Sequence, residues 1–393
     1  MNDRERFIAT MHYQPRDRAP LYDFNFWDET LPEWHKQGLP ASVNRANAHR
    51  YFGLDQSLGG GDMHGERGAI GSVTLCPSFD RVVLEDRGDH ELVQQGDGVR
   101  VLRKKWMGSI PHPEAYLLTD RASWEKHYKP RLDPDHPQRF PDNWEQRVAY
   151  WKDPGRTHML ALPGGSLYGW LRNWMGVENI SYLVYDDPAL FEEMVTTITD
   201  CIVGVLEKVL ATGASFEAAG MWEDMCYSGG PLLSPELFRK YLVPNYQRIT
   251  SLLRRHGIDV VWIDCDGRID DLIPLWLEGG VNTMFPIEVG TWGADPVHYR
   301  AEFGRELLMM GGFDKHILQG TPHDIEREID RLAPLVEEGG FIPMPDHRVP
   351  PDVPLENYLV YVRRARAVWG GNTNLEPMHI APAMEDLPCE AKR

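Results

Sequence analysis

The sequence predicts an α/β protein, a (β/α)8 TIM barrel with an N-terminal elaboration, on three observations. From residue 158 onward, short apolar segments alternate with helical patterns, as in a parallel sheet with helical crossovers. One apolar run, 260–263, leads directly into the acidic turn Asp264-Cys265-Asp266-Gly267, as expected where a buried strand ends at a functional mouth. The first strand–helix turn has no GxGxxG motif, which disfavours a dinucleotide-binding open sheet.

The domain organisation follows from this alternation of strands and helices. We expect residues 1–150 to form the N-terminal elaboration, which covers the barrel mouth, together with the first barrel elements. Residues 151–370 should form the main barrel and residues 371–393 a C-terminal tail. The chain has 393 residues with 42% hydrophobic content, enough for one barrel with a sizeable core.

Composition excludes several classes of function. The formal net charge of −18 argues against a nucleic-acid partner, because phosphate contacts need clustered Lys and Arg. No run of about 18 apolar residues suggests a membrane span, and the N-terminus does not resemble a signal peptide. The five cysteines lack CxxC spacing, which favours a reducing compartment, so we expect a cytoplasmic protein.

The first part of the chain predicts a short helix at 3–13 and an apolar segment at 21–24. A polar, β-rich stretch follows. Its segments 73–75, 81–84 and 99–102 predict the strands of an antiparallel insertion. Residues 111–157 are rich in Pro, Asp and His and predict loops with one helix.

The second part predicts six further strands, at 159–162, 215–220, 260–263, 281–285, 307–310 and 341–344. Helices should begin at Asp187-Pro188, Ser234-Pro235 and Thr321-Pro322, where a capping residue precedes proline. Further helices are expected at 270–277 and 355–367.

Acidic and histidine side chains follow the predicted strands: Glu223-Asp224, Asp264 and Asp266, Glu288, Asp314 with His316, and Asp346-His347. In a barrel these exits meet at one mouth, where carboxylates repel each other unless they are protonated or bound to a cation. With histidines nearby, a divalent metal is the economical explanation. The alternative, for each carboxylate taken alone, is that it caps a helix or pairs with Arg268 or Arg348.

Aromatic residues cluster near the same exits. We expect a substrate-binding cleft lined by Tyr168, Trp170, Trp174, Trp222 and Trp262, with Arg268 beside it. Core packing is the alternative for more than half of the tryptophans.

Several motifs resemble the uroporphyrinogen decarboxylase superfamily and, within it, the corrinoid-dependent methyltransferases. They are Arg4-Glu5-Arg6-Phe7, 15–20, 234–238, 241–244, Gly311-Gly312-Phe313-Asp314, 319–322 and, most specifically, 350–357. The resemblance implies a (β/α)8 barrel. The stretch 22–29 lacks the arginines of true porphyrinogen decarboxylases, so a carboxylated tetrapyrrole substrate is not expected.

The resemblance also implies a metal site. Thiol-directed relatives bind zinc with a His-x-Cys-Gly motif and a late Cys, which fall on Asp264, Asp266 and His347 here. We therefore expect Asp264, Asp266 and His347 to bind a divalent metal, with Glu223 as the fourth ligand. Zinc is the first candidate for this metal. Carboxylate and imidazole ligands suit a Lewis acid acting on oxygen.

The expected function is demethylation of a small O-methyl compound, with transfer of the methyl group to cobalamin. Glu223, Asp314 and His316 are the expected catalytic groups, the last two as proton donors. No cobalamin-binding motif is visible, so the corrinoid should arrive on a partner protein or free. A methylcorrinoid-to-thiol or pterin methyltransferase, a metal-dependent decarboxylase or lyase on a non-porphyrin acid, and a binding protein without chemistry remain alternatives. A homodimer is also left open.

Overall fold

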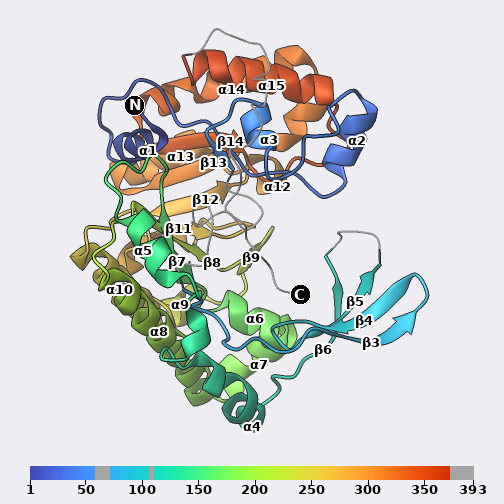
Figure 1. Cartoon of the computed structure of the whole chain (residues 1–393), viewed down its shortest axis with the longest axis vertical. Helices are drawn as coiled ribbons and strands as arrows, with labels where there is room; N and C mark the ends of the chain where they lie inside the picture. Colours follow the sequence, from blue (N-terminus) through green and yellow to red (C-terminus); the bar gives the residue numbers. More distant parts are fainter. Residues whose placement is uncertain (58–70, 106–109, 372–393) are drawn as a thin grey trace.

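The computed structural model describes residues 1–57, 71–105 and 110–371 (Figure 1). Six parallel strands form one sheet in the order β14-β13-β12-β11-β8-β7, and β1 and β2 form a separate parallel pair. The eight strands are β1 Tyr22–Asp23, β2 Gln56–Ser57, β7 Ala161–Gly165, β8 Ala218–Trp222, β11 Val261–Asp264, β12 Thr283–Ile287, β13 Leu308–Phe313 and β14 Phe341–Pro345.

The β1–β2 pair lies next to β14, the edge of the six-stranded sheet. Just beyond β1, Phe26 forms a parallel bridge with Val349. The Trp27 N–H donates to the Val349 carbonyl at 3.2 Å, and the Val349 N–H donates to the Asn25 carbonyl at 3.1 Å. Strands therefore neighbour each other in chain order, as in a TIM barrel, and the predicted fold class is confirmed.

Helices cover the outside of the strands (Figure 1). Those of the main barrel region are α6 Gly169–Met175, α7 Val177–Asp186, α8 Pro188–Leu210, α9 Pro235–Tyr241, α10 Val243–Arg255, α11 Ile273–Gly279, α12 Val289–Trp292, α13 Pro296–Phe303, α14 Pro322–Glu338 and α15 Leu355–Val368. The predicted starts are confirmed, because the side chains of Asp187, Ser234 and Thr321 each cap the helix that follows. None of the helices in the described ranges combines the length and apolar character needed to cross a bilayer.

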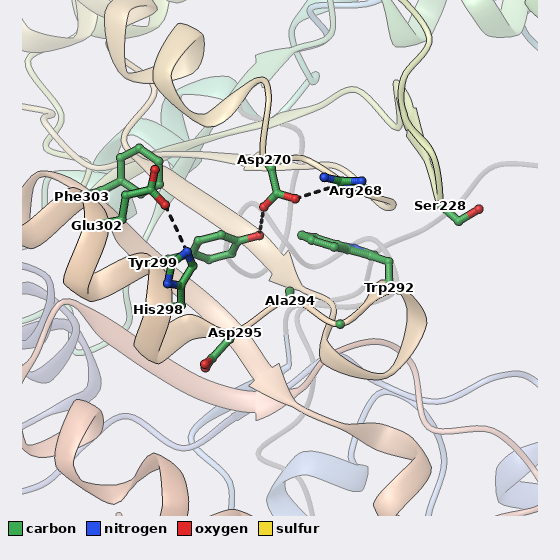
Figure 2. A pocket seen from close by; sticks show the side chains of 11 residues that line it. Ser228, Arg268, Asp270, Trp292, Ala294, Asp295, His298, Tyr299, Glu302 and Phe303 are labelled. Atoms are coloured by element: carbon green, nitrogen blue, oxygen red, sulfur yellow. Dashed lines mark hydrogen bonds and ion pairs between the residues drawn. The ribbon is translucent and has the colours of Figure 1, made fainter.

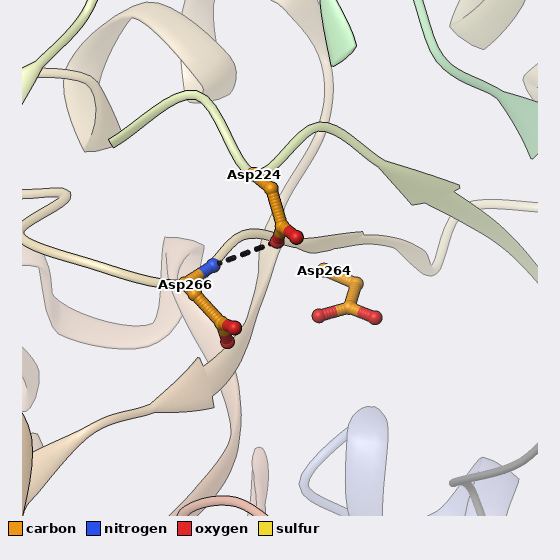
Figure 3. A group of neighbouring side chains, drawn as sticks. All are labelled: Asp224, Asp264 and Asp266. Atoms are coloured by element: carbon orange, nitrogen blue, oxygen red, sulfur yellow. Dashed lines mark hydrogen bonds between the residues drawn. The ribbon is translucent and has the colours of Figure 1, made fainter. Parts of the chain in front are cut away.

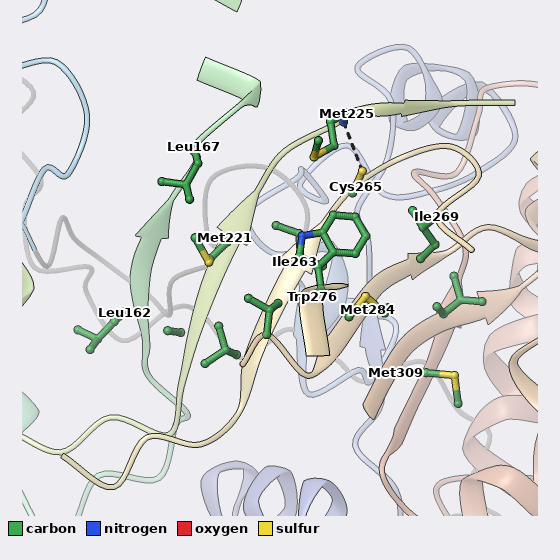
Figure 4. Packing of buried hydrophobic residues seen from close by; sticks show 14 of the residues in the cluster. Leu162, Leu167, Met221, Met225, Ile263, Cys265, Ile269, Trp276, Met284 and Met309 are labelled. Atoms are coloured by element: carbon green, nitrogen blue, oxygen red, sulfur yellow. Dashed lines mark hydrogen bonds between the residues drawn. The ribbon is translucent and has the colours of Figure 1, made fainter. Parts of the chain in front are cut away.

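Strand residues alternate between two apolar layers. Ile263, Met221 and Met284 pack outward beneath the helices (Figure 4). Val260 and Trp262 belong to a second cluster, with residues of the other strands, that fills the barrel interior. This alternation, two residues per repeat, decides which strand-end side chains face the mouth.

The N-terminal part contributes α1 Asp3–Met11, α2 Thr30–Lys36, α3 Ala48–Tyr51, α4 Arg121–Ser123 and α5 Trp144–Trp151. A four-stranded antiparallel sheet, β3 Val82–Arg87, β4 His90–Gln94, β5 Arg100–Lys104 and β6 His112–Ala115, projects from the barrel beyond α6 and α7 (Figure 1). The strand predicted at 73–75 was wrong, because these residues form irregular structure. The division at residue 150 and the covering role of this part stay predictions. All but the first residue of the expected tail, 371–393, lies outside the described residues.

Candidate metal and catalytic site

Three aspartates converge where β8 and β11 end. Asp224, Asp264 and Asp266 each offer a carboxylate oxygen, and these oxygens lie within 4.8 Å of one another (Figure 3). Asp264 is the last residue of β11, Asp266 follows it by two positions, and Asp224 lies two positions beyond β8. The structure thus brings Asp264 and Asp266 together, while their role as metal ligands stays a prediction.

Strand alternation explains which side chains reach this point. Asp264 continues the inward-facing series of Val260 and Trp262, so its carboxylate lies above the filled barrel interior. Asp224 has a left-handed backbone conformation with φ of 41°, which is rare and strained for a residue with a Cβ. The Asp266 N–H fixes this conformation by donating to Asp224 Oδ1 at 3.2 Å.

His347 joins the cluster from the end of β14. Its Nε2 lies 3.4 Å from Asp266 Oδ2. The imidazole packs between two aromatic rings of the β1 segment, Phe24 at 5.2 Å and Trp27 at 5.6 Å between centroids. The structure therefore brings together Asp264, Asp266 and His347, as the sequence predicted.

Burial and mutual repulsion raise the pKa of two of these aspartates. Burial, reinforced by the negative charge of Asp266, raises the pKa of Asp224 to about 6. Burial raises the pKa of Asp264 well above its usual range, and the charge of Asp224 raises it further. Asp266 Oδ1 is buried without a hydrogen-bond donor within the described chain. A cluster of buried carboxylates is stabilised when it binds either a proton or a cation, because each reduces the repulsion between the negative charges.

Glu223, expected as a ligand and catalytic group, lies elsewhere. Its carboxylate is fully buried and accepts hydrogen bonds from the Tyr246 hydroxyl at 2.6 Å and the Ser166 hydroxyl at 3.0 Å. Three successive backbone N–H groups, from residues 167–169, also donate to it. With its lone pairs used in this way, Glu223 joins the β7–α6 turn to β8, and its neighbour Asp224 takes the place in the cluster.

Asp314 and His316, expected as proton donors, contact each other and not the three aspartates. Asp314 caps a short 3-10 helix, accepting from the His316 N–H at 2.9 Å, and lies 3.0 Å from the His316 ring nitrogen. His316 is exposed to solvent. No hydrogen bond or ion pair in the described ranges joins either residue to the cluster.

Of the five aromatic residues predicted to line a cleft, three are buried in the core and two are partly exposed. Tyr168, Trp174 and Trp262 are buried, and Trp262 fills the barrel interior against Gly220, where a Cβ would overlap its ring. Trp170 and Trp222 are partly exposed. Trp222 lies two residues before Asp224, with the Arg172 guanidinium 5.3 Å from its ring centroid. Of the two partly exposed rings, Trp222 is therefore the one that adjoins the cluster along the chain.

Arg268 lies outside the cluster, on the wall of a separate cavity of about 680 Å³ (Figure 2). Its Nε pairs with Asp270 at 2.9 Å, and Asp270 also accepts from the Tyr299 hydroxyl at 2.6 Å. Trp292 and Tyr299, from α12 and α13, also line this cavity. No residue of this cavity belongs to the carboxylate cluster.

The sequence placed Asp224 at a strand exit but assigned the ligand role to its neighbour Glu223, and it named Arg348 only as a possible partner of a carboxylate. It missed Arg172 altogether. Arg172 donates to the Asp224 carbonyl at 2.6 Å and lies 3.9 Å from Asp224 Oδ2. Counting in twos from Ala218, an inward-facing residue, would have selected Asp224 over Glu223. No local pattern marks either arginine.

A sequence model of the uroporphyrinogen decarboxylase (URO-D) family matches residues 172–368, half of the chain, including β8, β11 and β14. The chain belongs to the URO-D family. This URO-D family member is 26% identical to the uroporphyrinogen decarboxylase of Shewanella pealeana over 172 residues, 41% of this chain and 44% of the relative's length. It is 24% identical to that of Xanthomonas campestris pv. campestris over 358 residues, 84% and 87% of the two chains.

A solved structure has the same fold. A methyltransferase from Methanosarcina mazei superposes with a TM-score of 0.59 at 14% sequence identity, covering 93% of this chain and 99% of its own. At this identity the likeness establishes the fold. The shared fold covers nearly the whole chain.

The cluster fits a divalent cation. Its donors are three carboxylates and one imidazole, the ligand types that zinc and harder divalent ions accept. The orphaned Asp266 Oδ1 and the raised pKa of Asp224 and Asp264 are what carboxylates show when no counter-charge is bound.

Proposed function

We propose that this protein is a corrinoid-dependent methyltransferase that demethylates a small methoxylated compound. The corrinoid is the acceptor substrate and arrives on a partner protein. The convergence of Asp264, Asp266 and His347 carries the proposal. These residues stand at the ligand positions of the methyltransferases that the sequence resembles, with every thiolate replaced.

Asp264, Asp266 and His347 would hold a divalent ion, for which zinc remains our first expectation. When bound, the ion supplies Lewis acidity toward the ether oxygen of the substrate. The replacement of thiolates by carboxylates favours an oxygen ligand over a sulfur ligand. Thiol methylation, the reaction of the thiolate-bearing relatives, is for this reason the less suitable alternative.

Asp224 would supply the proton. The carbon–oxygen bond of the methoxy group breaks with its electron pair going to oxygen, and the methyl group passes to the acceptor. The departing oxygen then needs a proton, and Asp224, whose pKa burial raises to about 6, is a carboxyl at the mouth suited to exchange one with it. Arg172, which donates to the Asp224 carbonyl, fixes this residue at the mouth.

A decarboxylase acting on a non-porphyrin acid is the second candidate. The names of the curated relatives favour it. Asp264 suits it too, because burial raises the pKa of this carboxyl and keeps it protonated for delivery to the carbon that loses CO2.

The test mixes the metal-loaded protein with reduced cobalamin and a panel of methoxylated aromatic compounds. Methylcobalamin, followed by its absorbance, is the expected product. Methyl loss from methylcobalamin on addition of a thiol or a pterin would instead reverse the direction. Release of CO2 from a carboxylic acid without methylcobalamin would favour the decarboxylase.

A further inference from the structure

Arg348 is a cation at the mouth that has no anionic partner among residues 1–57, 71–105 and 110–371. It follows His347 directly, and its backbone is fixed because the next residue, Val349, bridges to Phe26. Its guanidinium carbon lies 5.4 Å from the centroid of the Trp27 ring. Across the described residues, no carboxylate lies within ion-pair distance of it, and no acceptor hydrogen-bonds to it.

The surroundings make this arrangement costly without a ligand. Arg348 is half-buried, and the like charge of Arg45 acts on it. Arg45 is itself paired with Asp28. Asp264 and Asp266 attract Arg348 from a distance but do not contact it. A partly desolvated, unpaired guanidinium is stabilised by an anion that enters the site.

Two other arginines near the strand exits provide the contrast. Arg172 donates to the Asp224 carbonyl, and Arg268 pairs with Asp270. Both have their partners within the protein. Arg348 alone among these three has no acceptor within the described residues, and its guanidinium lies over the face of the Trp27 ring. The planar guanidinium can bind a carboxylate with two parallel hydrogen bonds.

We propose that Arg348 binds the carboxylate of the substrate, which makes the substrate a methoxylated aromatic carboxylic acid. The inference rests on the proposed function for the methoxy group, whereas the carboxylate rests on Arg348 alone. The aromatic part follows from the partly exposed rings of Trp27 and Trp222 at the same mouth. Arg348 is thus a specificity-determining residue beside the metal and proton-donating groups.

The experiment measures binding, separately from methyl transfer. Quenching of tryptophan fluorescence or calorimetry compares 4-methoxybenzoate with the neutral 4-methoxybenzyl alcohol on the full-length, zinc-loaded protein. Arg348→Gln should weaken binding of the acid by about tenfold to a hundredfold, the loss of a charge-assisted hydrogen-bond pair, and change binding of the alcohol less than twofold. Arg348→Lys should fall between, because lysine keeps the charge without the fork.

Arg327→Gln is the matched control, since Arg327 is exposed on α14 and pairs with Asp324. It should bind both compounds like the parent protein. Equal affinity of Arg348→Gln and the parent for the acid, at equal melting temperature, overturns the inference, and so does failure of the parent to bind the acid. A raised KM for cobalamin in Arg348→Gln, with binding of the acid unchanged, would assign the arginine to a phosphate of the corrinoid and also overturn it. Normal binding of the acid without methylcobalamin formation defeats the proposed function and leaves the carboxylate site standing.

Discussion

The backbone N–H of Asp266 donates a hydrogen bond of 3.2 Å to Oδ1 of Asp224, which joins the exits of β8 and β11 within the carboxylate cluster. The donor belongs to the main chain, so it survives any substitution of the Asp266 side chain. Asp224 is therefore positioned by the fold, while the side chains of Asp264 and Asp266 are left for a ligand. This separation allows the role of each aspartate to be tested alone.

Asp266→Asn should lose the metal, whereas Asp224→Asn should retain it and lose activity. The first variant removes a charged oxygen ligand, and the second removes a proton donor while keeping the acceptor for the Asp266 N–H. We expect metal affinity to fall at least a hundredfold in Asp266→Asn and methyl transfer at least a hundredfold in both. Elemental analysis and the methylcobalamin assay measure the two quantities. Loss of metal from Asp224→Asn would make Asp224 a ligand.

Stability of the metal-free protein should fall as pH rises from about 4 through 6. The pKa of Asp224 is raised to about 6 in the folded state, so the folded protein binds more protons than the unfolded chain in this range. The contribution of Asp224 to the unfolding free energy is on the order of 2 kcal/mol. It is fully present below the pKa that Asp224 has in the unfolded chain, and it is lost as the pH rises above the pKa in the folded protein. Urea unfolding with a chelator at pH 4.5 and 7.5 measures it.

Two comparisons test whether Asp224 causes this pH dependence of stability. Asp224→Asn, which does not titrate, should reduce the difference in unfolding free energy between the two pH values. A divalent cation should stabilise the parent protein more at pH 7.5 than at pH 4.5, because protons compete with it for the carboxylates. If the protein is equally stable at both pH values, with and without the cation, then folding is not coupled to the protonation of these carboxylates.

The sequence predicted the barrel and the presence of its later strands, because each strand is a short apolar run and helices have clear starts, as at Asp187 and Thr321. The last four strands end one to three residues beyond their predicted ends. It also predicted the acidic mouth, since strand exits meet at one end of a barrel. The failed strand at 73–75 had β-branched residues but no partner strand, and pairing is a tertiary property.

The details of the site depended on facts that local sequence does not contain. Glu223 and Asp224 are adjacent carboxylates, and strand alternation together with a positive φ decides that the second one faces the mouth. Trp262 and Trp170 look alike in sequence, yet one fills the barrel and the other is partly exposed. Arg348 stands out only in three dimensions, where none of the described residues pairs with it.

Glu223→Gln should destabilise the fold by about 2–4 kcal/mol, which would distinguish an anchoring role from metal binding. The glutamine would place an NH2 group against donors that now point at a carboxylate oxygen, such as the Tyr246 hydroxyl and the Gly169 N–H. A ligand role predicts the opposite pattern, with unchanged stability of the metal-free protein and loss of the ion. Chemical denaturation in chelator, followed by metal titration of the folded variant, separates the two.

Glu217→Gln should lower stability without changing the metal site, because Glu217 lies just before β8, at the end of that strand away from the cluster. Its carboxylate accepts from the buried Arg156 guanidinium at 2.8 and 2.9 Å and from Arg4 at 2.6 Å. Removing one partner of a buried ion pair leaves the other charge uncompensated, at a cost of about 3–5 kcal/mol. Thermal unfolding should therefore shift well below that of the parent protein, while metal content and cobalamin methylation per folded molecule stay the same. A folded Glu217→Gln protein with a depleted metal would mean that the two ends of the barrel are coupled, and that activity losses in the mouth variants report on the whole fold.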